Sequence, residues 1–113
     1  MSATLPKSER LSGKKAIALL LKNGEWGSCG SYKYCWASNE EGINRILVSI
    51  PKRNFKRAVK RNLLKRRTRE AYRTQKELLH RNGVDVMFVY TSQEVDTLPQ
   101  IRDNIAKILS RIQ

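Results

Sequence analysis

The spacing of apolar residues along the chain predicts alternating helices and short strands. Apolar residues recur at helical spacing between positions 12 and 23, which predicts a first helix from about Ser12 to Asn23. Ser12 is a residue type that caps helix starts, and Gly24 follows the helix as a helix-ending glycine does. Residues 1–8 precede this helix and are expected to form a loose N-terminal leader.

Two short segments with strand-like patterns follow. In residues 31–37 aromatic side chains alternate with other residues, and residues 45–50 form a short apolar run. A turn-like segment, Asn39–Gly42, separates them, so they are expected to pair as a hairpin. A further short strand at Trp26–Ser28 is only weakly indicated.

The second half of the chain predicts a helix, a strand and a helix. After Pro51, a long helix is expected from about Phe55 or Ala58 to Arg81. Residues Val84–Tyr90 are almost all apolar, which is typical of a strand buried on both faces. A last helix is expected over Leu98–Ile112, with Thr97 as its cap.

This order of elements predicts a single small domain, residues 9–113, of the α/β class. The 113 residues are enough for one hydrophobic core. No repeat, linker or low-complexity tract divides the chain. The helices should pack on a small central sheet to form an α/β sandwich.

The number and distribution of basic residues give the first indication of function. Lys and Arg number 23 against 10 acids, giving a net charge of +13. Residues 51–76 hold 12 of the basic residues and 1 acid. Such a concentration indicates a polyanionic partner: nucleic acid, an anionic membrane or an acidic protein. No apolar stretch approaches the roughly 18–20 residues that a membrane span needs, and no secretory signal is recognised.

The predicted long helix separates its charge from its apolar side. Asn62, Lys65, Arg66, Arg69 and Arg73 lie on the arc opposite Leu64, Thr68, Ala71 and Tyr72. Arg61 projects toward the apolar arc. Arginine offers a planar fork that matches phosphate oxygens, and lysine adds a flexible point charge. This face is therefore predicted to bind phosphates.

The aromatic side chains of the first strand have two open interpretations. Tyr32, Tyr34 and Trp36 share one face of the predicted sheet. They either stack nucleobases on an open face or form core beneath a helix.

No catalytic motif is found in the sequence, so no catalytic residue, metal site or bound cofactor is expected in the protein itself. His80 is the only histidine and has no motif partner. Cys29 and Cys35 are interpreted as reduced thiols of a cytoplasmic protein.

One stretch carries a specific family resemblance. Residues Lys56–Glu70, KRAVKRNLLKRRTRE, resemble the signature of the bacterial ribonuclease P protein, with a departure at Leu63, where the family usually has Arg. Upstream, Arg45–Arg53 is similar to a family strand ending in Ser-Lys-Lys, with Pro51 in place of the usual Ser.

The resemblance implies a fold of order αβββαβα with a left-handed βαβ crossover. It also implies an accessory subunit of an endoribonuclease, in which a catalytic RNA removes the 5′ leader of precursor tRNA with Mg²⁺. The protein would be a cytoplasmic monomer in a 1:1 complex with that RNA. Two alternatives remain: a ribosomal or chaperone-type protein that binds structured RNA without processing it, and a DNA-binding protein.

The charge and the resemblance together predict the site residues. Contacts to the catalytic RNA are expected from Lys52, Arg53, Lys56, Arg57, Lys60, Arg61, Asn62, Lys65, Arg66, Arg69 and Arg73. A cleft between the first helix and the sheet would take the leader, and its family positions correspond to Ile17, Leu21, Tyr32 and Tyr34. The family usually has Phe at the first two of these positions, and aliphatic side chains do not stack on bases as Phe does.

Overall fold

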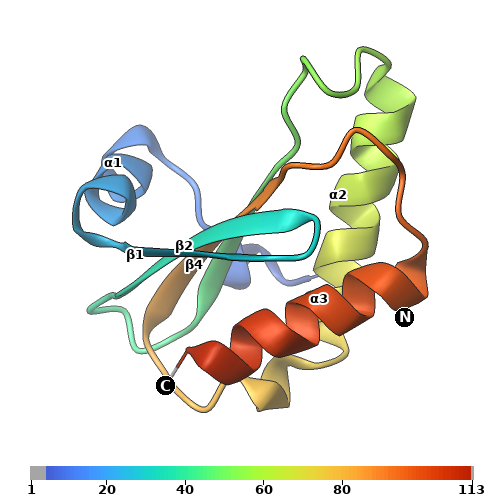
Figure 1. Ribbon diagram of the computed structural model, residues 1–113. Helices are drawn as coiled ribbons and strands as arrows, with labels where there is room; N and C mark the ends of the chain where they lie inside the picture. Colours follow the sequence, from blue (N-terminus) through green and yellow to red (C-terminus); the bar gives the residue numbers. More distant parts are fainter. Residues whose placement is uncertain (1–4, 113) are drawn as a thin grey trace.

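Helices cover both faces of a four-stranded mixed sheet in the computed structural model, which describes residues 5–112 (Figure 1). The order αβββαβα is confirmed, and two short 3₁₀ helices accompany it. The elements are η1 (Lys7–Glu9), α1 (Lys14–Asn23), β1 (Glu25–Cys29), β2 (Tyr32–Ser38), β3 (Arg45–Ser49), α2 (Ala58–Arg73), η2 (Lys76–Leu78), β4 (Val84–Tyr90) and α3 (Leu98–Arg111).

The strands lie in the order β1-β2-β4-β3, so the predicted pairing of β2 with β3 is wrong. β2 pairs antiparallel with β1 on one side and with β4 on the other, and β3 pairs parallel with β4. The physical reason lies in β4, which is apolar on both faces and therefore needs a central place. The parallel pair β3–β4, joined through α2, is the crossover for which the resemblance implies a left hand.

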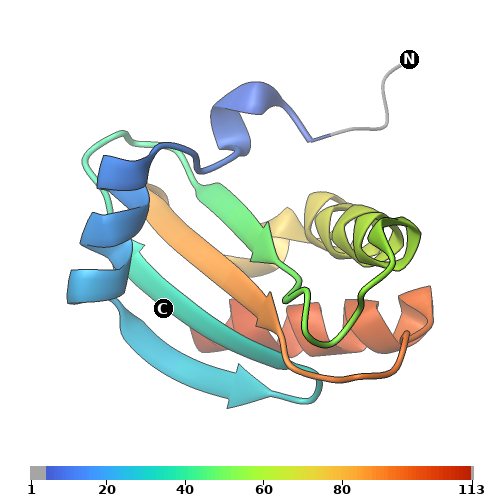
Figure 2. The same cartoon turned by 90° about the horizontal axis from the view of Figure 1, so that it is seen from above.

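Side chains of the sheet alternate between two helical layers. On one face, Tyr32, Tyr34 and the even-numbered residues of β4 pack against α2 and α3 in the main core. On the other face, Cys35 and Met87 pack with Leu11 and Leu20 in a smaller cluster. α1 lies across one end of this second face, and no other helix of residues 5–112 covers the rest (Figure 2). The sheet therefore has one closed face and one partly open face.

The helix α2 ends at Arg73, earlier than the expected Arg81. The buried amide of Gln75 donates hydrogen bonds to the carbonyls of Ala71 (2.9 Å) and Arg102 (3.1 Å), so it occupies the position where the helix would continue. The chain then turns through η2, which brings Leu79 into the core at 6% exposure.

The segment before α1 also departs from expectation. Ser12 does not cap α1, because the N-cap is Gly13, which has a φ of 94° and makes no side-chain cap bond. Residues 1–4 of the predicted loose leader lie outside the described residues. Of its remaining residues, Leu5 is buried in the main core, whereas Pro6, Lys7 and Ser8 are exposed, the last two within η1.

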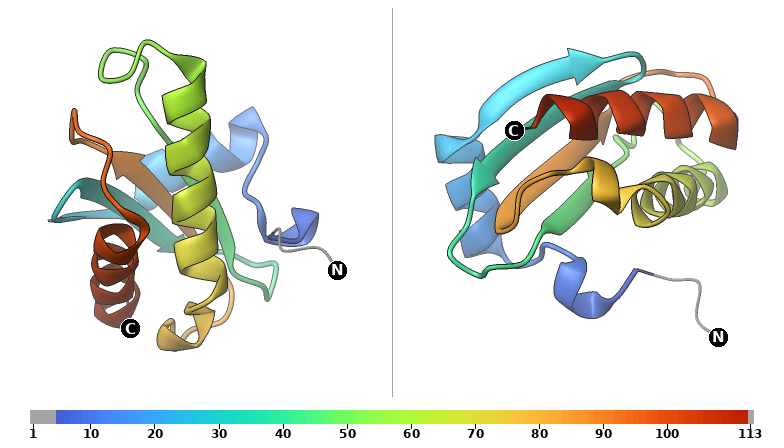
Figure 3. Two further views of the ribbon diagram at one scale, coloured as in Figure 1. Left: turned by 90° about the vertical axis from the view of Figure 1, so that its right-hand side faces the viewer. Right: turned by 90° about the horizontal axis from the view of Figure 1, so that it is seen from below.

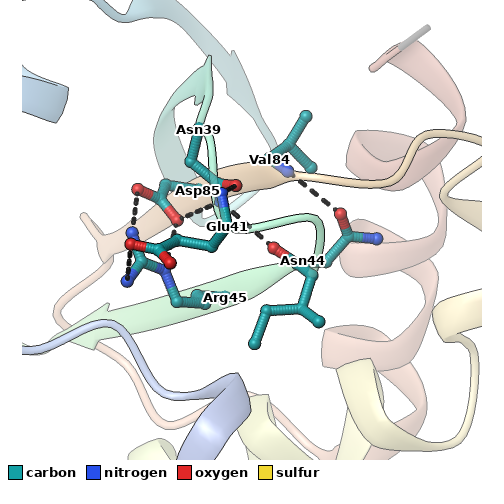
Figure 4. A network of polar contacts seen from close by, with 7 residues as sticks. Asn39, Glu41, Asn44, Arg45, Val84 and Asp85 are labelled. Atoms are coloured by element: carbon teal, nitrogen blue, oxygen red, sulfur yellow. Dashed lines mark hydrogen bonds and ion pairs between the residues drawn. The ribbon is translucent and has the colours of Figure 1, made fainter.

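Polar side chains fix the end of the sheet where β2, β3 and β4 meet (Figure 4). Arg45 donates two hydrogen bonds to Asp85, at 2.8 and 2.9 Å, and Asn39 donates a third at 2.7 Å. Asn44 accepts a bond from the backbone N–H of Val84. At the other side of the molecule, Thr97 forms the expected cap of α3 with Gln100.

Candidate nucleic-acid interface

The outer side of α2 carries the main positive surface. Leu64, Thr68, Ala71 and Tyr72 are buried, as the predicted apolar arc requires. Asn62 and Arg66 are exposed, and Lys65 and Arg69 are half-buried at the border of the same side. Figure 3 (left) shows this side of α2 with no other element in front of it. The predicted separation of charged and apolar sides along α2 is confirmed.

Some of the basic side chains already have partners within the fold. Arg73 donates two hydrogen bonds to Glu70, and Lys76 pairs with Glu9 at 2.9 Å. Arg67 donates to the carbonyl of Asp96. The guanidinium of Arg61 donates to the carbonyls of Phe55 (2.6 Å) and Lys56 (2.9 Å), so it holds the loop that precedes α2.

The remaining predicted cations make no ion pair in the part of the chain that the structure describes. They form the free cation set, defined as Lys52, Arg53, Lys56, Arg57, Lys60, Lys65, Arg66 and Arg69. Several uncompensated charges so close together repel one another, and a bound polyanion removes that cost. This arrangement favours phosphate binding along α2 and the loop before it.

Arg10 adds a basic side chain that the sequence analysis did not assign to the site. It lies next to β3, where it forms an isolated parallel bridge with Ile46. Partial burial lowers the pKa of Arg69, and the nearby positive charge of Arg10 lowers this pKa further. The two guanidiniums therefore extend the positive surface of α2 toward the N-terminal segment. Only the sheet topology brings them together.

The predicted leader cleft is not formed by the residues assigned to it. Tyr32 and Tyr34 point into the main core, at 0% and 7% exposure, on the face opposite α1. Ile17 packs on the other face, and Leu21 is 43% exposed. Neighbouring residues of a strand point to opposite faces of the sheet. The prediction places the even-numbered residues of β2 on the face that α1 covers, so both tyrosines are assigned to the wrong face. Of the two interpretations left open, core is correct for both tyrosines.

The partly open face beside α1 presents other residues. Trp26 and Ser28 of β1 share this face with Lys33 of β2, and all three are exposed. The ammonium of Lys33 lies 5.1 Å from the centre of the Trp26 ring. Their place on this face could not be predicted from the sequence, because β1 is only weakly indicated there. The alternation of side chains along β1 and β2 places Trp26, Ser28 and Lys33 on the same face of the sheet as Cys35.

The described residues contain no group of three or more His, Cys, Asp or Glu side chains that could hold a metal ion. Cys29 and Cys35 are both buried and free, and they lie in the two different core clusters. No helix within residues 5–112 is long and apolar enough to cross a membrane.

These observations define the class of the protein: a basic α+β domain with a mixed sheet and one helix that is rich in cations on its outer side. The model of the family described as Ribonuclease P matches residues 5–113. The chain belongs to the ribonuclease P protein family, and it is accordingly a protein of the ribonuclease P endoribonuclease, whose partners are the ribonuclease P RNA and the tRNA substrate.

Individual relatives agree with this assignment. The chain is 32% identical to the ribonuclease P protein component of Porphyromonas gingivalis (strain ATCC 33277) over 117 residues, covering 96% of this chain and 85% of that protein. It is 48% identical to the corresponding protein of Borrelia hermsii over 86 residues, covering 76% and 75% of the two chains. The structure of the RNase P protein from Thermotoga maritima superposes with a TM-score of 0.82 at 23% identity, covering 93% of this chain and 98% of that one.

Proposed function

We propose that this protein is the RNA-binding subunit of a ribonuclease P ribonucleoprotein and assists Mg²⁺-dependent removal of the 5′ leader from precursor tRNA. The catalytic RNA carries out the cleavage in this proposal, and the protein contributes no catalytic group. The protein acts in the cytoplasm as a monomer bound to one RNA. Mg²⁺ belongs to the assembled enzyme and has no site in the protein.

The free cation set is the observation that carries this proposal. Its members line α2 and the loop before it, where Glu70 is the one acid within residues 51–76 and is already paired with Arg73. Glu94, from the segment after β4, lies beside Lys56, Arg57 and Lys60 but makes no ion pair with them. Neutralising RNA phosphates releases condensed counterions, which supplies affinity with little dependence on sequence. Asn62 adds an exposed amide among these cations, able to hydrogen-bond a base edge or a 2′-hydroxyl.

Binding of the leader is assigned to the partly open sheet face beside α1. This face lies on the side of the sheet opposite α2 and α3, which pack on the closed face (Figure 2). A single strand lying there would run beside α1, which carries Lys14, Lys15 and Lys22 and no acidic residue. The proposal therefore divides the molecule into a surface for the catalytic RNA and a surface for the leader.

Reconstitution with a bacterial ribonuclease P RNA tests the proposal. Cleavage of precursor tRNA is measured at low Mg²⁺ with and without the protein. We expect the protein to stimulate 5′ leader removal, because its cations offset phosphate repulsion that Mg²⁺ otherwise screens. RNA binding without stimulation would contradict the processing role and would favour a protein that binds structured RNA without processing it.

A further inference from the structure

Trp26 is a half-exposed aromatic side chain on the edge strand of the sheet. Its exposure is 47%, and it lies on the face that α1 only partly covers. In the β1–β2 register Trp26 faces Cys35 and Ser28 faces Lys33, so Trp26 and Lys33 are diagonal neighbours on one face. This explains the 5.1 Å separation between the lysine ammonium and the ring centre.

The charges around this ring favour an anionic ligand. Among the strand residues that share the face, Asp85 is the only acid; it lies two strands away from β1, opposite Ala37, and its carboxylate is bound to Arg45. Lys33 makes no ion pair in the described part of the chain. An aromatic surface beside an unpaired cation is the combination that binds single-stranded nucleic acid, because the base stacks and the phosphate is neutralised.

Trp26 is also the only aromatic residue on this face within β1–β4 and α1 of the structure. The register places Tyr32, Tyr34 and Trp36 on the opposite face, and the sequence of α1, KKAIALLLKN, has no aromatic residue. Ile17 and Leu21 offer apolar contact but no ring for stacking. Among the side chains of these elements, the indole of Trp26 is therefore the one aromatic ring on which a base can stack at this face.

We propose that Trp26 stacks on a nucleobase of the precursor tRNA 5′ leader, with Lys33 contacting the phosphate of the same strand. This inference rests on the proposed function, because it names the residue through which the leader surface acts. In this chain the edge strand thus supplies the aromatic contact that Ile17 and Leu21 cannot make. Stacking on a flat ring is tolerant of sequence, so the contact serves leaders of different sequence.

The first test compares affinities in the assembled enzyme. Complexes of the catalytic RNA with wild-type protein, Trp26→Phe or Trp26→Leu are titrated with precursor tRNA and with mature tRNA. Loss of a stacked base predicts a roughly 5- to 150-fold weaker Kd for precursor tRNA with Trp26→Leu. Mature tRNA should bind equally to all three complexes, and Trp26→Phe, which keeps a ring, should retain most of the affinity.

The second test uses the fluorescence of the indole itself. A Trp36→Phe variant leaves Trp26 as the only tryptophan, and the matched Trp26→Phe variant leaves Trp36, which packs against the main core near Arg81. When precursor tRNA is added to the preformed complex, the emission of Trp26 should be quenched and that of Trp36 should not. This comparison remains available if Trp26→Leu fails to fold.

The outcomes separate this inference from the proposed function. If the wild-type complex binds precursor and mature tRNA equally, the leader-binding part of the proposed function fails. If wild type prefers precursor tRNA, Trp26→Leu keeps that preference and Trp26 emission is unchanged, the stacking role is overturned while leader binding stands. A purely structural role for Trp26 would lower thermal stability and weaken both RNAs together.

Discussion

The hydroxyl oxygens of Tyr32 and Thr68 lie 2.5 Å apart inside the main core, between β2 and α2. Thr68 donates its proton to the carbonyl of Leu64 at 2.8 Å, so Tyr32 is the donor to Thr68. Burial is the largest cause that raises the pKa of Tyr32, and the bond to Thr68 opposes it. The phenol is therefore a neutral donor that fastens α2 to the sheet.

Removing this hydroxyl should cost stability without affecting RNA binding. Tyr32→Phe deletes one buried hydrogen bond, so the free energy of unfolding should fall by about 1 kcal/mol. Urea denaturation measures this change. The affinity for ribonuclease P RNA should remain that of wild type, because Tyr32 is fully buried. Loss of RNA affinity without loss of stability would contradict the assignment of Tyr32 to the core.

Tyr72 lies on α2, the helix that carries Thr68, and provides a matched control for Tyr32. Its hydroxyl is buried and finds no hydrogen-bond partner within the described residues. Burial raises the pKa of Tyr72 to about 12, with a further contribution from Glu9. Because Tyr72→Phe removes an unsatisfied polar group, its effect on stability should be neutral or favourable. A larger loss for Tyr72→Phe than for Tyr32→Phe would show that the bond to Thr68 is not what stabilises the pair.

The sequence contains enough information for the elements but not for their arrangement. Local patterns predict β4 and α3 almost to the residue, because a run of apolar residues and a capping threonine are visible in the sequence. The place of β4 between β2 and β3 depends on tertiary packing, which no local pattern reports. The end of α2 depends on Gln75, whose amide bonds to Arg102 of a distant helix. The choice of face for Tyr34 follows from the same tertiary information.

The candidate site shows the same division. The free cations of α2 follow from helical periodicity alone, because exposure on a surface helix is a local property. Arg10 approaches Arg69 only through the bridge between the N-terminal segment and β3. Trp26 can be assigned to the open face only when β1 is paired with β2, which places it opposite Cys35 and diagonal to Lys33. The positions of Arg10 and Trp26 depend on strand order, which local sequence patterns do not specify.

Free and paired cations should differ in their effect on the salt dependence of RNA binding. Replacing Lys65, Arg66 and Arg69 by Ala should lower the slope of log K against log salt by roughly 0.7–0.9 for each phosphate that the variant no longer neutralises. Arg73→Ala and Lys76→Ala are matched controls on the same segment, because these side chains pair with Glu70 and Glu9. Filter binding at several salt concentrations measures the slopes. Equal slope changes for free and paired positions would contradict the assignment of the interface.

The Arg45–Asp85 pair should be a major source of stability at its end of the sheet. Asp85→Ala leaves Arg45, whose side chain is 20% exposed, without its bidentate partner, and should cost roughly 2–4 kcal/mol. The double variant with Arg45→Ala should cost less than the sum of the single changes, since it leaves no unpaired charge. Glu41→Ala is the control, because Glu41 is 61% exposed and 3.9 Å from Arg45. Additive losses in urea denaturation would contradict the coupling.

Acid should weaken the attachment of Glu70 to Arg73. The bond from Arg73 is the largest cause that lowers the pKa of Glu70, so the folded state holds this carboxylate charged to lower pH than the unfolded chain does. The contribution of the Glu70 carboxylate to stability is therefore fully present above its pKa in the unfolded chain, which is about 4.3. It is lost as the pH falls through the lower pKa of the folded state. The difference in free energy of unfolding between wild type and Glu70→Gln should accordingly shrink as the pH is lowered from 6 toward 3. The Asp103–Lys107 pair is more exposed, at 65% and 59%, so Asp103→Asn should show little difference from wild type throughout. A gap for Glu70→Gln that stays constant with pH would mean that the carboxylate acts through packing and not through its charge.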